Sequence, residues 1–440
     1  MVRILFISVL LSAQAASTQI ALPPGRLPGL PQLQVPPILN QPLPAGADAL
    51  DPPDLRNLRH VRIRDLIRTH RTVIEADPNG APIIRSEILV FSPADGVLER
   101  ARAAGFSVAR ERNLEGLDAR IVVLRGPDGS STTHGLKQLQ ILDPQGVYDF
   151  NHIYTDSGSL STRTSSTERE IRTAAAEMRD ATLKLGLIDG GVNVSHAVFQ
   201  GVSIHQHGCA GEPVPSAHGT AVASLMVGSS DSFHGAAPLG ELYAADVYCG
   251  VPTGGAVDAV ADALSWMARE HVPVVNVSLV GPPNATLENV VRLLIERGHI
   301  IVAAVGNDGP AAPPLYPASY EDVVGVTAVD RRDRVLLEAA RGSQVDFAAP
   351  GADMSAASGT QDFVIVRGTS FAAPIVAGIL ALQLRTPDKI AAHQAIADLA
   401  RQATDLGVPG PDPVYGNGLV GEALRPPAAL GSARANVRQD

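Results

Sequence analysis

Strand-like and helix-like segments alternate along the chain from residue 185 to residue 305. Short apolar runs predict the strands, and longer stretches with apolar residues at helical spacing predict the helices between them. The predicted strands are Leu185–Ile188, Leu242–Val247, Val274–Leu279 and Ile300–Val305, and the predicted helices are Ala217–Val227, Ala256–Arg269 and Leu287–Arg297. This alternation predicts an α/β fold, in which a mostly parallel sheet has right-handed crossovers and helices on both faces.

The composition fits this fold class and argues against one class of partner. Hydrophobic residues make up 45% of the chain and aromatic residues only 4%, so Ala, Val, Leu and Ile must build most of the core. Such residues suit helices packed closely on a parallel sheet. The formal net charge of −10 argues against nucleic acid as a partner, because phosphate backbones are bound by basic surfaces. We expect a monomer.

The first residues have the pattern of an export signal. Met1–Arg3 carry one positive charge, Ile4–Leu11 are almost wholly apolar, and Ala13–Ala15 fits the small-residue rule for a cleavage site. No segment reaches the length expected of a membrane-spanning helix. We therefore expect a signal peptide at residues 1–15, no membrane attachment after its removal, and a secreted or periplasmic protein. A retained N-terminal anchor is the alternative.

A linker and a small domain are expected between this signal and the α/β domain. Residues 16–54 are crowded with Pro and show no helical or strand period, which predicts a mobile linker. Residues 55–154 predict a compact α+β unit of the split βαβ kind. Its predicted strands are Ile88–Phe91 and Ala119–Leu124, and its predicted helices are Ala94–Ala104 and Leu136–Leu142.

A second linker is expected at residues 155–180, before the α/β domain. Within it Ser157–Thr167 is rich in Ser, Thr and Gly, and we expect it to be exposed and open to proteolysis. The α/β domain is expected over residues 181–425. A tail without apolar period follows at residues 426–440, where disorder is the simplest expectation.

Polar residues lie where several of the predicted elements begin or end. Asp189 and Asn307 each come just past a buried strand, and His218 and Ser370 each open an apolar helix. Functional groups gather at the carboxyl ends of the strands in such sheets, so we expect these four to meet. Alone, each has an ordinary role as a turn residue, a structural histidine or a helix cap. Together they supply the carboxylate, imidazole, hydroxyl and amide that acyl transfer requires.

The order Asp, His, Ser and the surrounding segments resemble the subtilisin-like serine peptidases. The resemblance runs from about Lys184 to Ala423 and rests on Leu187–Gly191, His218–Thr220, Ala304–Gly309, Tyr316–Ala318, Phe347–Gly351, Gly368–Pro374 and Tyr415–Val420. Phe371 stands where the family usually has Met. The resemblance implies that Ser370 is the nucleophile and His218 the general base. It likewise implies that Asp189 orients the imidazole and that Asn307 donates to the oxyanion.

The resemblance also implies where substrate binds. In this family a strand similar to Val277–Gly281 pairs with the substrate backbone by β-augmentation. The implied substrate-binding residues are Ser278, Leu279, Val280, Gly281, Gly306 and Leu315. Val280 and Leu315 occupy positions that are often Gly in the family. We therefore hypothesise a shallow apolar pocket that favours small or medium side chains.

The unit before the α/β domain resembles the propeptides of the same family. The likeness rests on the order of its elements and on Tyr148–Tyr154. It implies an intramolecular chaperone and inhibitor, and cleavage by the enzyme itself between about Tyr154 and Thr167. A permanent accessory domain is the alternative.

The two cysteines, Cys209 and Cys249, are compatible with one disulfide in an oxidising compartment. His205, His207 and Cys209 alternate on one face of a strand and could bind zinc, but a disulfide would use the same cysteine and no fourth ligand stands out. Calcium often stabilises the subtilisin-like peptidases, but no acidic loop in this sequence has convincing spacing of calcium ligands. We therefore expect no cofactor and leave calcium dependence open.

The sequence thus predicts a secreted serine endopeptidase made as a self-processing zymogen, acting on protein or peptide substrates. A catalytically silent relative that binds peptides or another protease through the same cleft is the alternative. An esterase is disfavoured, because no G-x-S-x-G elbow surrounds Ser370 and the order of the three residues differs from that class.

Overall fold

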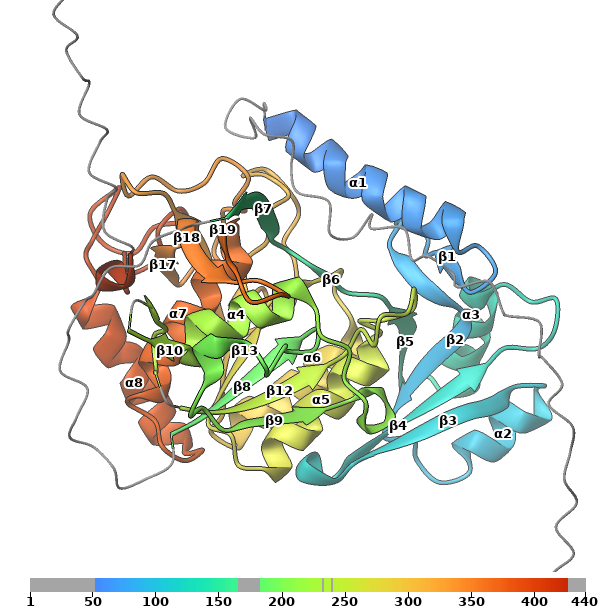
Figure 1. The fold of residues 1–440 in the computed structure, drawn as a ribbon. Coiled ribbons are helices and arrows are strands. Elements are labelled where there is room, and N and C mark those ends of the chain that lie inside the picture. The colour runs from blue at the N-terminus through green and yellow to red at the C-terminus, as the bar shows by residue number, and fades with distance from the viewer. Residues whose placement is uncertain (1–51, 165–182, 232, 239, 426–440) are drawn as a thin grey trace, which may run out of the picture. The chain divides into compact units, whose positions relative to one another are not determined.

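The computed structural model describes residues 52–164, 183–231, 233–238 and 240–425. Its centre is a sheet of seven parallel strands in the order β17-β16-β15-β13-β8-β12-β9 (Figure 1). The strands are β8 (Lys184–Asp189), β9 (Ile204–His207), β12 (Glu241–Asp246), β13 (Val274–Val277), β15 (Ile300–Ala304), β16 (Val324–Val329) and β17 (Phe347–Pro350). The predicted α/β fold with a parallel sheet is confirmed, and the predicted signal peptide and C-terminal tail lie outside the described residues.

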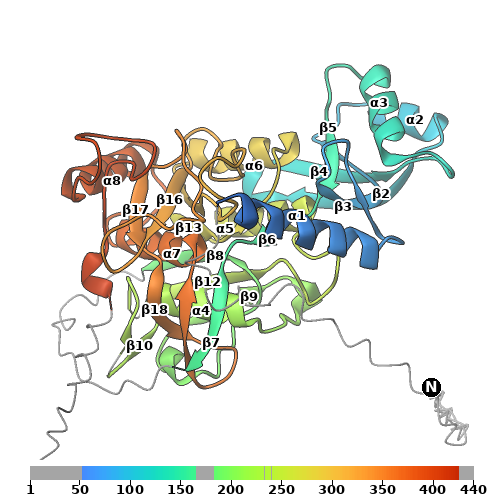
Figure 2. The ribbon, with the colours of Figure 1, turned by 90° about the horizontal axis from the view of Figure 1, so that it is seen from above.

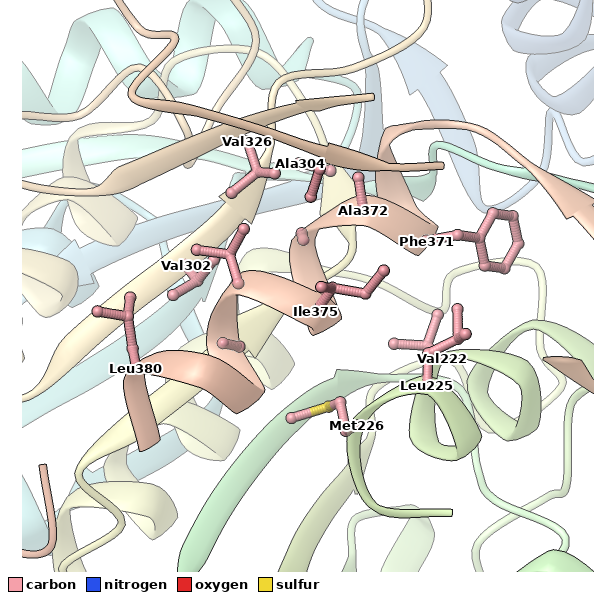
Figure 3. Packing of buried hydrophobic residues seen from close by; sticks show 14 of the residues in the cluster. Val222, Leu225, Met226, Val302, Ala304, Val326, Phe371, Ala372, Ile375 and Leu380 are labelled. Carbon is pink, nitrogen blue, oxygen red and sulfur yellow. The ribbon is translucent and has the colours of Figure 1, made fainter. Parts of the chain in front are cut away.

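Helices cover both faces of this sheet, as predicted. The pairs are α4 (Ala217–Val227) with α7 (Thr369–Ala381) on one face and α5 (Val257–Arg269) with α6 (Ala285–Glu296) on the other, while α8 (Lys389–Gln402) packs beside α7. Successive residues of a buried strand serve opposite faces, so Val302 packs with α4 and α7 and Ile301 with α5 and α6. Figure 3 shows Val302, Ala304 and Val326 of the sheet against Ala372, Ile375 and Leu380 of α7.

A second sheet, this one antiparallel, is formed by residues 74–152. Its strands are β1 (Ile74–Ala76), β2 (Pro82–Phe91), β3 (Ser107–Leu114), β4 (Ala119–Arg125) and β5 (Val147–His152), in the order β1-β2-β4-β3 with β5 on β2. Ile88 and Val122 face α2 (Val97–Ala103) and α3 (Thr132–Leu142), whereas Leu89 and Val123 pack into the core that contains α5 and α6. The predicted strands and helices of this unit are present. The sequence did not predict β3, whose Arg110, Glu111 and Arg112 hide its strand period.

Helix α1 (Pro52–Thr69) precedes this sheet and was not predicted. The expectation of a linker through residue 54 is therefore wrong for residues 52–54. The helix contacts β1 and β2, and Arg59 donates a hydrogen bond of 2.8 Å from Nη1 to Oδ2 of Asp308. Contacts with distant residues determine where α1 lies, and a local sequence pattern cannot reveal such contacts. Figure 2 shows α1 beside β2 of this sheet.

The segment after β5 differs most from the prediction. β6 (Thr155–Asp156) pairs antiparallel with β14 (Leu279–Val280), and β7 (Ser159–Thr164) adds to β19 (Phe363–Arg367), whose other neighbour is β18 (Ala352–Ala357). Ser157, between β6 and β7, is buried. The expectation of exposure is wrong for Ser157, and the expectation of a linker is wrong for residues 159–164, because their backbone pairs with β19. Residues 165–167 lie outside the described part. Within the described ranges no helix is long and apolar enough to cross a membrane.

Candidate active site

Asp189 and His218 are brought together at the carboxyl edge of the parallel sheet. Asp189 is the last residue of β8, and its Oδ1 accepts a hydrogen bond from Gly190 N. His218 lies in the first turn of α4, where Ser216 caps the helix by accepting from Gly219 N. His218 Nδ1 is 2.9 Å from Oδ2 and 3.0 Å from Oδ1 of Asp189, and both side chains are buried. This contact fixes the imidazole with Nε2 turned toward the cleft.

The electrostatic surroundings favour the charged imidazole. Burial alone would lower the pKa of His218, but the carboxylates of Asp189 and Asp156 raise the pKa to about 9. Burial raises the pKa of Asp156 itself, and the Asp189 charge acts in the same direction, against the neighbouring His218 and Arg62. Asp156 of β6 therefore acts electrostatically on the His218 imidazole.

Ser370 lies in the first turn of α7. Gly368 precedes the helix with a φ of 136°, a conformation that side chains rarely adopt. Ser370 is fully buried because its Oγ lies 2.7 Å from Oγ of Ser157. His218 Nε2 is buried without a hydrogen-bond partner among the described residues. The Ser370 hydroxyl is thus hydrogen-bonded to Ser157, and no hydrogen bond joins it to the His218 imidazole.

Asn307 directs its amide into the same space. Its Oδ1 accepts a hydrogen bond from Thr369 N at 3.1 Å, which orients the side chain, and its Nδ2 is buried with no partner in the described part of the chain. A Cβ added to Gly368 would lie 3.1 Å from Asn307 Nδ2 and 3.1 Å from the carbonyl oxygen of Ser157. The Asn307 amide and the Ser157 carbonyl therefore border the same small space next to Gly368, and no hydrogen bond joins them in this structure.

The segment from Ile153 to Gly158 lies in the cleft between two walls. On one side Tyr154 N donates to Gly255 O at 2.8 Å, and Ile153 bridges Ala256. On the other side Thr155 pairs with Val280 and Asp156 with Leu279. This double pairing holds the segment so that Ser157 lies against Ser370.

Three of the six predicted substrate-binding residues, Leu279, Val280 and Gly281, contact this segment. Leu279 and Val280 provide the pairing strand, and Ser278 Oγ donates to the Ser370 carbonyl at 3.1 Å. Leu315 packs onto Gly306, where an added Cβ would lie 2.5 Å from Leu315 Cδ1. The Leu315 side chain thus occupies space beside the strand that leads to Asn307, consistent with the hypothesis of a shallow pocket.

The ring of Tyr154 packs against Gly281. The ring of Tyr154 is fully buried, its nearest atoms would lie 2.6 Å from a Cβ on Gly281, and its hydroxyl donates to Pro282 O at 2.5 Å. A large aromatic side chain therefore fits this position, three residues before Ser157.

Charged groups join the N-terminal sheet to the helices of the α/β domain. Asp258, buried in the first turn of α5, accepts hydrogen bonds from Arg110 and Arg112 of β3 and from Asn151 of β5. Burial opposes its charge, yet Arg110 and Arg112 lower the pKa of Asp258 to about 2. At the start of α6, Asp149 accepts from Ala285 N at 2.7 Å. The sequence did not predict these contacts, because each partner lies in a different unit.

Cys209 and Cys249 form a disulfide, as one of the two alternatives predicted. The bond occupies the sulfur that zinc would need. His205 Nε2 lies 2.7 Å from Glu241 Oε1, and His207 Nε2 lies 3.3 Å from Asp262 Oδ2. The two histidines therefore contact different carboxylates, and the zinc alternative is not supported.

Sequence reasoning did not single out the residues that lie against Ser370. Ser157 and Gly158 fall inside the predicted interval between Tyr154 and Thr167, which stays a prediction. The only local signal was a pair of small residues shortly after the Tyr148–Tyr154 motif.

Fold and site together define a class. A parallel α/β sheet with a carboxylate, an imidazole and a serine hydroxyl at its carboxyl edge belongs to the subtilisin-like serine hydrolases. The sequence profile of the Subtilase family matches residues 180–418. Subtilisin BL and Subtilisin Savinase of Lederbergia lenta are each 34% identical over 249 residues, covering 53% of this chain and 90% of theirs. The chain belongs to the subtilase family of serine endopeptidases.

Two further comparisons show how much of each protein is similar to this chain. M-protease of Shouchella clausii is also 34% identical over 249 residues, but the match spans only 64% of that protein. The crystal structure of fervidolysin from Fervidobacterium pennivorans, a keratinolytic enzyme related to subtilisin, has a TM-score of 0.63 at 19% identity. That alignment covers 80% of this chain and 62% of fervidolysin, so the shared fold extends beyond residues 180–418.

Proposed function

We propose that this chain is an exported endopeptidase made as a zymogen that cleaves itself between Ser157 and Gly158. The observation that carries the proposal is the segment in the cleft, which pairs with β14 as a substrate strand would and brings its Ser157 Oγ to 2.7 Å from Ser370 Oγ. Residues 55–157 then act as the inhibitory propeptide, removed from the peptidase part after cleavage.

The proposed chemistry follows from the geometry. Ser370 Oγ attacks the Ser157 carbonyl carbon while His218 Nε2 takes its proton, and Asp189 stabilises the resulting imidazolium. Asn307 Nδ2 and the backbone N–H groups at the start of α7 stabilise the oxyanion. His218 then donates its proton to the Gly158 nitrogen as the peptide bond breaks. Water hydrolyses the acyl-enzyme by the reverse proton path.

The bound segment also supports a substrate preference. Ser157, the residue before the proposed bond, is small, and the ring of Tyr154 lies against Gly281. We expect protein substrates to be cleaved after small residues, with an aromatic residue three positions earlier. Tetrapeptide substrates that differ only in the last residue before the bond test this, with Ala faster than Phe.

The test of self-processing compares the purified full-length chain with Ser370→Ala at neutral pH. Intact mass and N-terminal sequencing should show a new N-terminus at Gly158 in the wild type only, and only the wild type should digest casein. A chain that is never processed and leaves casein intact would overturn the proposal in favour of a silent, peptide-binding relative. Processing elsewhere would leave the activity standing and refute the assigned bond.

A further inference from the structure

Gly158, directly after the proposed scissile bond, is enclosed by two side chains. A Cβ at this position would lie 2.6 Å from Phe371 Cε2 and 3.0 Å from both Phe371 Cζ and His218 Nε2. Real Cβ atoms do not come closer than about 3.0 Å to such atoms. The backbone of Gly158 does not have a positive φ. Glycine is therefore favoured here by lack of space and not by backbone conformation.

Phe371 has little freedom to move away. It is fully buried in the first turn of α7, and its ring centroid lies 5.2 Å from that of His218. Figure 3 shows the ring at the end of α7, close to Val222 of α4. Because the adjoining imidazole must keep its place for catalysis, neither wall of this small space can withdraw without loss of packing or activity.

The chain beyond Gly158 continues along a second surface. β7 pairs antiparallel with β19, with Ser159 opposite Arg367, Leu160 opposite Val366 and Thr164 opposite Val364. β19 pairs on its other side with β18. One extended segment thus runs from β14, past Ser370, onto the edge of β19.

We propose that the side of the cleft beyond the scissile bond recognises extended polypeptide segments that begin with glycine, with Phe371 enforcing the glycine and the edge of β19 pairing with the residues that follow. The occupant is the stretch of a protein substrate that follows the cleaved bond, which takes the place β7 holds in the uncleaved chain. Strand addition to an exposed sheet edge binds through backbone hydrogen bonds and tolerates many sequences. This inference rests on the proposed peptidase function and adds its substrate class.

The glycine preference is tested with quenched fluorescent peptides that carry Tyr-Thr-Ala-Ser before the bond and Gly, Ala or Ser after it. The processed wild type should favour Gly over Ala by about 100-fold in kcat/KM, because one methylene of excess volume costs about 10- to 200-fold in a closed pocket. Phe371→Met should reduce this ratio to about tenfold. Phe347→Met is the matched control: it also removes a buried ring, but from β17 in the core, and should leave the ratio unchanged.

The strand pairing is tested with peptides that keep glycine and extend two or seven residues beyond the bond. The longer peptide should have a kcat/KM about tenfold higher, and N-methylation along it should reduce kcat/KM about two- to tenfold at alternate positions only. Alternation is the signature of an antiparallel ladder, in which successive N–H groups point to opposite sides.

Each result tests one part of the proposal, either the role of Phe371 or the pairing with β19. An equal rate with Gly and Ala, or a ratio that Phe371→Met leaves unchanged, overturns the role of Phe371. Equal kcat/KM values for the short and long peptides, or no alternation with N-methylation, overturn pairing of the substrate with β19. The same results are expected if β7 stays paired with β19 after processing, and that case overturns the pairing as well. Cleavage of the short glycine peptide by the wild type and not by Ser370→Ala keeps the proposed function intact in every one of these cases.

Discussion

The hydroxyl oxygens of Ser157 and Ser370 lie 2.7 Å apart, while Nε2 of His218 has no hydrogen-bond partner among the described residues. In the proposed self-cleavage, the Ser157 hydroxyl would compete with His218 for the Ser370 hydroxyl. Attack on the proposed bond would then require the hydrogen bond between Ser157 and Ser370 to break first.

Ser157→Ala should accelerate self-processing. Without the Ser157 hydroxyl, Ser370 is free to donate to His218, and loss of one competing hydrogen bond of about 1 kcal/mol corresponds to about fivefold in rate. The measurement is the rate at which full-length chain disappears on a denaturing gel. Thr72→Ala, on an exposed turn of the N-terminal part, is the control and should process at the wild-type rate. A slower Ser157→Ala chain would contradict this account.

Asp156→Asn should shift self-processing to lower pH. Burial opposes protonation of His218, but Asp189 and Asp156 raise its pKa to about 9, so the imidazole is charged at neutral pH and cannot accept the proton of Ser370. Processing should therefore speed up as pH rises toward about 9. Removing the Asp156 charge lowers the pKa of His218, so the pH–rate curve moves to lower pH. Asp95→Asn, an exposed acid of the same unit, should leave the curve where it is.

Arg59→Ala should weaken the contact between α1 and the loop that carries Asn307 and Asp308. Arg59 and Asp308 form a partly buried ion pair at 2.8 Å, one residue beyond Asn307. A pair of this kind contributes about 0.5–1 kcal/mol, so the delay between cleavage and full activity should shorten about two- to fivefold. The delay is measured as the lag in peptide hydrolysis after processing begins. Arg68→Ala, which breaks an exposed pair with Asp65 on the same helix, should keep the wild-type lag.

Asp258→Asn should weaken the contact between the N-terminal sheet and α5. Burial opposes the charge of Asp258, but Arg110 and Arg112 lower its pKa to about 2, so its stabilising effect is present above its ordinary pKa and is lost as pH falls toward about 2. Removing the charge leaves both guanidinium groups without this partner and should speed release of the cleaved N-terminal part about tenfold at pH 7. Asp262→Asn is the control, because it lies 3.7 Å from Arg112 and is more exposed. Co-purification of the two parts over time measures the release.

Removing the Cys209–Cys249 disulfide should lower the free energy of unfolding by about 2–4 kcal/mol, because the bond closes a long loop. Denaturant unfolding of the Ser370→Ala chain with and without Cys209→Ser and Cys249→Ser gives this difference without self-digestion. Zinc should not raise the stability of the Cys249→Ser chain, which lacks the disulfide but keeps Cys209. A rise with zinc would favour a metal site at His205, His207 and Cys209.

The parallel sheet and the meeting of four polar residues were predictable because their signals are local. Buried parallel strands are continuous apolar runs, and Asp189 and Asn307 follow two such runs directly. His218 and Ser370 open helices whose small apolar residues mark them in the sequence. Topology then places the ends of these elements at one edge of the sheet, whatever the details of packing.

The elements that the sequence did not predict contain many charged or small residues. The arginines of β3 pair with Asp258 across the interface, and α1 is placed by contacts with β1, β2 and Asp308. Neither element shows an apolar period from which to predict it.

Amino-acid order alone determined the α/β class, the order of the catalytic types and the interval that contains the proposed cleavage bond. Tertiary structure decided which bond lies against Ser370, because Ser157, Gly158 and β7 carry no apolar pattern and are held by backbone pairing with β14 and β19 and by contact with Phe371. Such pairing depends on which strand edges are free nearby, and that is a property of the folded chain.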